Sequence, residues 1–537
     1  MCLSTTSRCL RINSSPAPLA SVSLTAKKQA SKHARAPPCP RSTRSIRPFS
    51  RNLGHRSADI TMSLPKDFHW GFATAAYQIE GSVDVDGRGP SIWDTFSAIP
   101  GKIADGSSGA VACDSYKRTA EDIALLKELG ANSYRFSIAW SRIIPLGGRN
   151  DPVNQKGIDH YVKFVDDLLE AGITPFITLF HWDLPDALDK RYGGLLNREE
   201  FPLDFENYAR IMFKAIPKCQ HWITFNEPFC SAILGYNSGY FAPGHTSDRS
   251  RSAVGDSARE PWLAGHNMLV AHGRAVKAYR EGFKPTQGGE IGITLNGDAT
   301  YPWDPSDPAD VEACDRKIEF AISWFADPIY FGHYPESMRK QLGDRLPTFT
   351  DEEVALVKGS NDFYGMNHYT ANYVKHKTGE PAEDDFLGNL ELLFYNKAGD
   401  CIGPETQSFW LRPHAQGFRD LLNWLSKRYG GPKIYVTENG TSLKGENDLP
   451  LEKIVEDDFR VKYFNDYVNA MAKAVSEDGV DVRGYLAWSL LDNYEWAEGF
   501  ETRFGVTFVD YVNNQKRYPK KSAKSLKPLF DSLIKKD

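Results

Sequence analysis

Short runs of β-branched and aromatic residues alternate with helical patterns along most of this chain. Residues 158–169 and 461–475 repeat apolar side chains at spacings of three and four, which is typical of helices with one buried face. Apolar strands separated by helices form parallel sheets, and eight such units close into a barrel without a free edge. We therefore predict an α/β fold, a single (β/α)8 TIM barrel with long loops after its strands. The eight predicted strands are 71–78, 134–140, 174–183, 222–227, 291–296, 363–369, 434–438 and 484–490.

The first 61 residues differ in composition from the rest of the 537-residue chain. They carry eleven Lys and Arg and one acidic residue, Asp59, are rich in Ser and Pro, and lack strand or helix periodicity. Such a segment cannot bury a core. We predict that residues 1–61 form a basic, disordered leader and that residues 62–537 form the barrel domain, because α/β barrels of this length are common as one unit.

The leader has two interpretations. It is either an upstream extension without function, with Met62 as the natural start, or an organelle transit peptide, since it is rich in Arg and Ser and poor in acid. An unbroken apolar stretch of the kind found in secretory signals is missing from it. We expect a cytoplasmic protein, with organelle targeting through residues 1–61 as the alternative.

Charge and cysteine usage exclude several classes of partner. Residues 62–537 hold 53 Lys and Arg against 68 Asp and Glu, a net charge of −15, whereas binders of nucleic acid or anionic lipid need a basic face. No apolar run approaches the roughly 20 residues that span a bilayer. The five cysteines after the leader are widely spaced, without CxxC or His/Cys clusters. We expect reduced thiols, no metal, no cofactor, and neither nucleic acid nor membrane as partner.

Two carboxylates stand at the predicted ends of buried strands. Glu227 follows the strand at 222–227 and Glu438 follows the strand at 434–438. Either glutamate alone could lie beside a helix N-terminus or in a surface ion pair. Because the carboxyl ends of all barrel strands meet at one face, where active sites lie, the pair predicts acid/base chemistry there.

Other strand ends carry side chains suited to a sugar. Amides and carboxylates bind pairs of hydroxyls, and indoles stack on the apolar face of a sugar ring. Core packing is the alternative for each aromatic residue and for a lone histidine. The candidates are Gln78, Arg135, His181, Trp182, Asn367, Tyr369, Trp488, Glu495 and Trp496.

These residues lie in motifs that resemble glycoside hydrolase family 1, the retaining β-glucosidases, and especially the intracellular enzymes of filamentous fungi. The resemblance covers about residues 64–530. Its motifs are FHWGFATAAYQIEG (68–81), YRFS (134–137), HWDLP (181–185), TFNEP (224–228), YVTENG (435–440) and WSLLDNYEW (488–496).

The resemblance implies roles for these positions. Glu227 corresponds to the acid/base and Glu438 to the nucleophile, supported by Arg135 and Tyr369; retaining enzymes hold the two carboxyls about 5–5.5 Å apart. Asn226 corresponds to the residue that bonds the sugar 2-hydroxyl. The other implied substrate-binding residues are Gln78, His181, Trp182, Asn367, Tyr369, Trp488, Glu495, Trp496 and Phe504.

The resemblance also implies a substrate class. Family thioglucosidases have glutamine at the position of Glu227, and phospho-glycosidases have serine at the position of Glu495, so we expect a neutral O-linked β-glucoside such as cellobiose. Transglycosylation and side activity on β-galactosides or β-fucosides are further expectations, and the oligomeric state is left open. For the aglycone side we expect Cys230, Ile233, Leu234, Tyr240, Asn296 and Phe325.

Other functions compete with this interpretation. A catalytically dead sugar-binding barrel would normally lose a carboxylate, and this chain keeps both. An α/β-barrel enzyme of metal or pyridoxal-phosphate chemistry would need a ligand cluster or a phosphate loop, and the sequence has neither. A physiological transglycosylase would use the same covalent intermediate and stays open.

Overall fold

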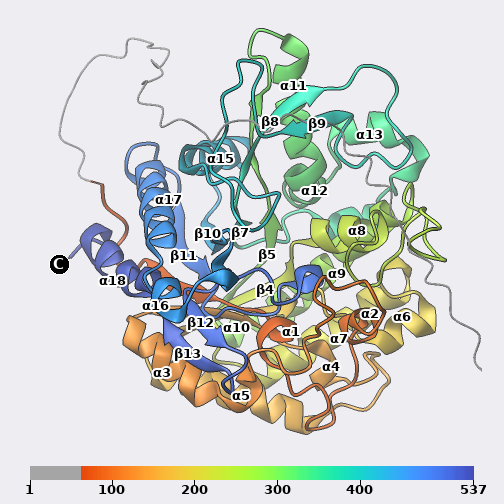
Figure 1. Cartoon of the computed structure of the whole chain (residues 1–537). Helices are drawn as coiled ribbons and strands as arrows, with labels where there is room; N and C mark the ends of the chain where they lie inside the picture. Colours follow the sequence, from red (N-terminus) through yellow and green to blue (C-terminus); the bar gives the residue numbers. More distant parts are fainter. Residues whose placement is uncertain (1–61, 537) are drawn as a thin grey trace, which may run out of the picture. The chain divides into compact units, whose positions relative to one another are not determined.

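The structure is a computed structural model that describes residues 62–536. Eight parallel strands close into a barrel in the order β1-β11-β10-β7-β5-β4-β3-β2, which confirms the predicted fold. Figure 1 shows β4, β5, β7, β10 and β11 together near the centre of the molecule. The prediction for residues 1–61 falls outside the described residues. The barrel strands are β1 (His69–Ala73), β2 (Ser133–Ser137), β3 (Thr174–Phe180), β4 (His221–Asn226), β5 (Glu290–Asn296), β7 (Tyr364–Asn367), β10 (Ile434–Asn439) and β11 (Val482–Trp488).

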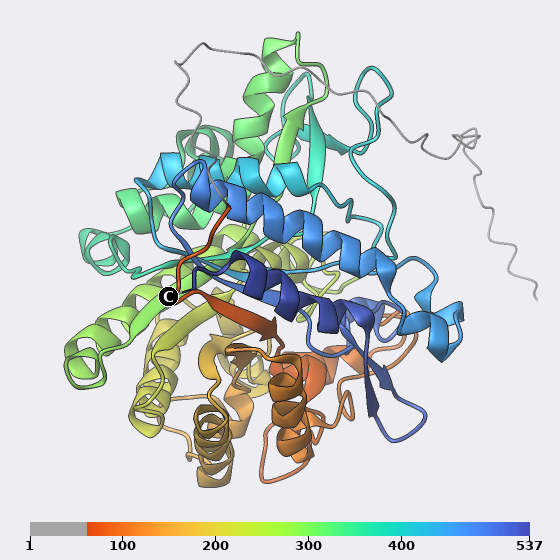
Figure 2. The ribbon, with the colours of Figure 1, turned by 90° about the vertical axis from the view of Figure 1, so that its left-hand side faces the viewer.

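Helices connect the strands and surround the barrel, and α17 and α18 run side by side on its outside (Figure 2). In the described chain no helix is both long and apolar enough to cross a membrane. The helices are α1 (Ala76–Ile79), α2 (Ile92–Ser97), α3 (Thr119–Leu129), α4 (Trp140–Ile143), α5 (Gln155–Glu170), α6 (Asp186–Tyr192), α7 (Glu200–Ala215), α8 (Pro228–Tyr236), α9 (Glu260–Gly282), α10 (Lys284–Gln287), α11 (Pro308–Ile318), α12 (Trp324–Phe331), α13 (Glu336–Leu342), α14 (Asp351–Val357), α15 (Ala415–Tyr429), α16 (Leu451–Ile454), α17 (Asp458–Ser476) and α18 (Lys521–Leu533).

Helix α5 shows how the apolar pattern fixes which face is buried. Ile158, Tyr161, Val165 and Leu168 recur at spacings of three and four, and all four side chains are buried. Helix α17 repeats this pattern, so both helices predicted from periodicity are confirmed. Helix α3 ends at Gly130, whose φ of 75° is the left-handed conformation that glycine adopts at low cost.

Two small sheets stand outside the barrel and were not predicted. Strands β6 (Ala299–Pro302), β8 (Ala371–His376) and β9 (Leu390–Leu393) form a three-stranded sheet from the chain that follows β5 and β7. Strands β12 (Thr507–Asp510) and β13 (Lys516–Pro519) form a hairpin. The long segment after β7 is therefore partly structured, because it contains β8 and β9.

One glycine sets how closely two strands pack at that end. A Cβ atom on Gly440 would lie 1.9 Å from the carbonyl oxygen of Trp488. Strand β10 pairs with β11 here, with Asn439 opposite Ala487. Because Gly440 has no side chain, the end of β10 packs directly on β11 and the position of Glu438 is fixed.

Candidate active site

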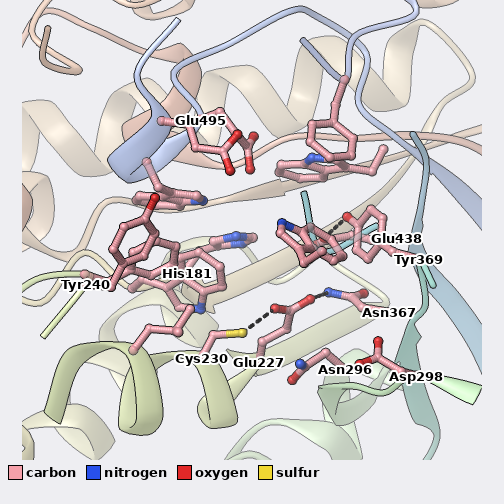
Figure 3. A pocket seen from close by; sticks show the side chains of 18 of the residues that line it. His181, Glu227, Cys230, Tyr240, Asn296, Asp298, Asn367, Tyr369, Glu438 and Glu495 are labelled. Atoms are coloured by element: carbon pink, nitrogen blue, oxygen red, sulfur yellow. Dashed lines mark hydrogen bonds between the residues drawn. The ribbon is translucent and has the colours of Figure 1, made fainter. Parts of the chain in front are cut away.

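A cavity of about 310 Å³ lies at the carboxyl ends of the barrel strands (Figure 3). Ten of the predicted site residues line it, and the other three, Gln78, Arg135 and Asn226, are fully buried and hydrogen-bond to lining residues. The structure thus brings all thirteen together. The ten lining residues are His181, Trp182, Glu227, Asn367, Tyr369, Glu438, Trp488, Glu495, Trp496 and Phe504.

Glu438 receives the strongest hydrogen bonds in the cavity. Arg135 Nη1 donates to its Oε1 over 2.6 Å, and the Tyr369 hydroxyl donates to its Oε2 over 2.5 Å. Burial is the largest influence and raises the pKa of Glu438 above its ordinary value, although the Arg135 charge and these hydrogen bonds act in the opposite direction. A full positive charge at 2.6 Å thus favours the carboxylate form of this residue.

Glu227 lies in a different environment, between the end of β4 and the start of α8. Asn367 Nδ2 donates to its Oε1 over 2.6 Å, and the Cys230 thiol donates to its Oε2 over 3.1 Å. Burial, followed by the charge of Glu438, raises the pKa of Glu227 to about 8. Near neutral pH this residue therefore carries a proton that it can donate.

The backbone aims Glu227 into the cavity. Its φ of 45° and ψ of 65° are left-handed, a conformation that is costly for a residue with a Cβ atom and that clusters at functional sites. Pro228 then occupies the first turn of α8, where its missing N–H is not needed. The Asn-Glu-Pro sequence thus encodes both the end of the strand and the direction of the side chain.

Asn226 is held in one orientation by its neighbours. Its Oδ1 accepts hydrogen bonds from Arg135 Nη2 at 2.6 Å and from Asn367 Nδ2 at 3.0 Å. Its Nδ2 therefore faces His181, and donates to His181 Nε2 at 3.1 Å. Burial and the charge of Arg135 lower the pKa of His181 well below its ordinary value, so the imidazole is neutral.

Gln78 and Glu495 form a further polar contact of the site. Gln78 Nε2 donates to the Tyr494 carbonyl at 3.0 Å and to Glu495 Oε2 at 3.3 Å, while Gln78 Oε1 is buried without a hydrogen-bond partner among the described residues. Burial, then the charges of Glu498, Glu438 and Glu227, raise the pKa of Glu495 well above its ordinary value. These buried oxygens are suited to pairing with the hydroxyls of a ligand.

Aromatic rings form the apolar walls of the cavity. The His181 ring stacks on Trp488 and on Trp496, with ring centroids 5.9 Å apart in both pairs. Trp182 donates its indole N–H to the carbonyl of Asn226 at 2.9 Å, and Phe504 packs edge-on against Tyr369. A cavity with carboxylates at its centre and indoles at its sides is suited to a polyhydroxylated ring.

Comparison with known proteins shows the family to which a chain with this site belongs. Residues 60–535 match the sequence model of Glycosyl hydrolase family 1. This chain belongs to glycosyl hydrolase family 1.

Three relatives place this family 1 hydrolase among fungal proteins. It is similar to a GH1 β-glucosidase of Humicola insolens solved in complex with glucose, with 89% identity over 89% of this chain and 100% of that one, and a TM-score of 0.89. It is similar to β-glucosidase 2 of Trichoderma reesei solved with Tris, with 74% identity over 88% and 100% of the two chains and a TM-score of 0.86. It is 57% identical to β-glucosidase 1B of Phanerodontia chrysosporium, over 89% of this chain and 87% of that protein.

Two predictions at the outer part of this family 1 site are wrong. Ile233 and Phe325 do not line the cavity but are fully buried in the core. Cys230 and Leu234 lie four residues apart on α8 and face the cavity, whereas Ile233 is turned about 100° around the helix from Leu234 and packs in the core. The predictions for Cys230, Leu234, Tyr240 and Asn296 as lining residues are confirmed.

Sequence reasoning missed several lining residues of this hydrolase. Three of them, Phe241, Phe409 and Trp410, stand in the segments at 231–262 and 376–412, whose length was the only signal. The others directly follow β5 or lie in the short 3-10 helix at Trp496–Glu498. Phe409 is the most prominent of them, since 73% of its surface is exposed at the cavity mouth. The missed residues are Phe241, Gly297, Asp298, Phe409, Trp410 and Glu498.

Metal binding was not expected, and the described residues contain no group of three or more His, Cys, Asp or Glu side chains arranged to hold an ion. Glu227 and Glu438 supply a proton donor and a carboxylate at one cavity.

Proposed function

We propose that this family 1 hydrolase is a retaining β-glucosidase in which Glu438 is the nucleophile and Glu227 is the acid/base. β-Glucosidase activity is supported by the family and by the names of its fungal relatives. One observation supports the two roles. Glu438 is bonded to a guanidinium, which favours its charged form, whereas Glu227 has its pKa raised to about 8 and keeps its proton.

In the first step the Glu438 carboxylate attacks the anomeric carbon of the sugar. The glycosidic bond breaks, its electron pair goes to the leaving oxygen, and that oxygen takes the proton of Glu227. A covalent α-glucosyl ester on Glu438 is the product of this step. The charge of Glu438 is thereby removed, so the pKa of Glu227, now a carboxylate, falls.

In the second step Glu227 accepts a proton from water as the water oxygen attacks the same carbon. The ester bond breaks, Glu438 leaves as a carboxylate, and β-glucose is released. A sugar hydroxyl in place of water gives transglycosylation by the same route. The two inversions retain the β-configuration.

Hydroxyl recognition follows from the buried polar atoms around the carboxylates. Asn226 Nδ2 is held at the cavity wall and is assigned to the 2-hydroxyl, where its hydrogen bond strengthens as charge develops. Gln78, His181 and Glu495 are assigned to the other hydroxyls of the ring, and Trp488 to its apolar face.

We assign neutral β-D-glucosides such as cellobiose as substrates, with β-galactosides and β-fucosides as side substrates. Glu495, Glu498 and Asp298 line the cavity, and these acids disfavour a phosphorylated or otherwise anionic sugar. A cytoplasmic location remains a prediction, and it would suit a role in cleaving imported disaccharides.

The proposal is tested by following cellobiose hydrolysis by the protein of residues 62–537 with proton NMR. Retention predicts that β-glucose is the first anomer released from the non-reducing end, before mutarotation produces the α-anomer. If α-glucose appears first, the reaction is inverting and the nucleophile assignment is wrong. If calorimetry detects glucoside binding without any hydrolysis, the protein is a sugar-binding barrel.

A further inference from the structure

The Cys230 thiol contacts the proton-transferring group of the site directly. Cys230 lies in the first turn of α8, three residues after Glu227, and its Sγ is 3.1 Å from Glu227 Oε2 (Figure 3). Burial and the charge of Glu227 raise the pKa of this thiol well above its ordinary value. It therefore stays a neutral thiol, which can donate its S–H or accept a hydrogen bond weakly through sulfur.

The two oxygens of Glu227 are not equivalent. Asn367 Nδ2 donates to Oε1 over 2.6 Å, and the orientation of this amide is fixed because its Oδ1 accepts from the Thr437 hydroxyl at 2.7 Å. An amide N–H is a donor only, so Oε1 must act as an acceptor. The proton of Glu227 therefore resides on Oε2, the oxygen that Cys230 contacts.

We propose that Cys230 is a positioning residue that holds Glu227 Oε2 in place for proton transfer in both steps of the reaction. The inference rests on the proposed acid/base role of Glu227. When Glu227 is a carboxylate, the thiol donates to Oε2. When Glu227 is protonated, the sulfur accepts weakly, and the proton is left free to move to the leaving oxygen.

A thiol has a specific advantage over a hydroxyl at this place. A hydroxyl donates a stronger hydrogen bond to a carboxylate and would stabilise the ionised form of Glu227. Without any donor, the ionised form would lose one of its two hydrogen bonds. Burial and the charge of Glu438 keep the acid protonated near neutral pH, and the thiol, as a weak donor, lowers the pKa of Glu227 less than a hydroxyl would while still supporting the carboxylate of the second step.

Several other charged or titratable groups affect the ionisation of Glu227, and none of them is changed in the test. Glu438 on β10 and Glu495 after β11 disfavour ionisation of Glu227, whereas Arg135 on β2 favours it. Asp298, after β5, acts on Cys230. The titratable or charged groups that face Glu227 or Cys230 are Arg135, Asp298, Tyr369, Glu438 and Glu495.

The test compares Cys230→Ser, Cys230→Ala and the parent protein by the pH dependence of kcat/KM on an aryl β-glucoside. The basic limb reports the loss of the Glu227 proton. We expect Cys230→Ser to move this limb to lower pH and Cys230→Ala to move it to higher pH, each by about half a unit to one unit. Cys314→Ser, in which a half-buried thiol on α11 is changed, is the control and leaves the limb in place.

If Cys230 only filled space, both variants would lower the activity, but they would not shift the basic limb in opposite directions. The proposal is overturned if the basic limb lies at the same pH in all three proteins, or if it shifts in the same direction in both variants. If Cys230→Ala does not fold, as judged by circular dichroism, the serine variant decides alone through the direction of its shift. Glu227→Gln separates the two proposals, because a retained basic limb in that variant means that Glu227 is not the acid and the proposed function fails.

Discussion

Arg135 on β2 donates a 2.6 Å hydrogen bond to Glu438 on β10, although β1 and β11 separate these two strands in the barrel. The guanidinium also bonds the Thr178 hydroxyl, the Thr437 carbonyl and Asn226, so it is fixed from several sides. An arginine with no exposed surface therefore connects the proposed nucleophile to the residue assigned to the 2-hydroxyl. The proposed mechanism therefore couples substrate binding to the orientation of Glu438 through Arg135.

Replacement of Tyr369 by phenylalanine tests the second donor to Glu438. Loss of a hydrogen bond to a charged group costs about 1.5–3 kcal/mol, so we expect kcat to fall by about 10- to 100-fold. The acidic limb of the pH profile should move to higher pH, because the Tyr369 hydroxyl lowers the pKa of Glu438. Steady-state kinetics of Tyr369→Phe measure both effects. Tyr518→Phe, on β13, is the matched control, and an unchanged acidic limb in Tyr369→Phe contradicts the assignment.

Glu227→Gln removes the proton donor and keeps the shape of the side chain. We expect hydrolysis of cellobiose to fall by about 10²- to 10⁴-fold, the range typical of general acid catalysis. The covalent step with 2,4-dinitrophenyl β-glucoside should be nearly unaffected, because its leaving group departs without a proton. Pre-steady-state release of dinitrophenol measures this step. An equal loss on both substrates would show that Glu227 is not the acid.

The pH profile of the parent protein follows from the two glutamates. Glu227 must be protonated in the free enzyme, and burial with the Glu438 charge raises its pKa to about 8. Activity is therefore present below this pH and is lost as the pH rises through about 8. Measurement of kcat/KM from pH 5 to pH 10 should show a basic limb near 8. A basic limb near 5 would mean that the raised pKa does not operate in solution.

A buried charge network that involves the segments after β10 and β11 makes a prediction about stability. The Lys520 ammonium has no exposed surface and bonds Glu446 at 2.6 Å and Asp492 at 3.1 Å. Lys520→Met leaves both carboxylates partly uncompensated, and breaking such a buried pair costs about 3–5 kcal/mol. Urea unfolding should show a clearly lower midpoint for this variant.

The neighbouring Lys521 provides the control for Lys520. It forms an exposed ion pair with Asp458, in which more than half of each side chain is accessible to water. Exposed pairs contribute little, so Lys521→Met should unfold at the midpoint of the parent protein. If both variants lose the same stability, the effect comes from the helix terminus and not from the buried network.

Alternation of apolar strands and amphipathic helices was sufficient to predict the barrel, because each strand must be covered on its outer face. The ends of the strands were less predictable. Gln78 was placed at the end of a strand, but β1 stops at Ala73 and Gln78 lies on α1. The Ala76 N–H at the start of α1 donates to the Ser137 hydroxyl of β2 at 2.7 Å, a contact between distant segments that no local pattern shows.

The inner site could be predicted from motifs, whereas the outer site could be predicted only in part. Glu227 and Glu438 belong to strands whose ends the barrel brings to one face. Phe409 lies in a long loop whose path depends on packing against other loops, so its place at the cavity mouth has no local signal. The apolar side chain of Phe325 suits a cavity wall and the core equally well. In the structure it lies in the core, where it packs against Trp324.

The central claim is that Glu438 forms a covalent bond to the sugar, and Glu438→Gly with 2,4-dinitrophenyl β-glucoside tests it most directly. Without added nucleophile the variant should be inactive. With sodium azide it should release dinitrophenol and form α-glucosyl azide, because azide enters from the face that Glu438 vacates. Product analysis by NMR that shows β-glucosyl azide, or a variant that hydrolyses cellobiose without azide, would contradict the account.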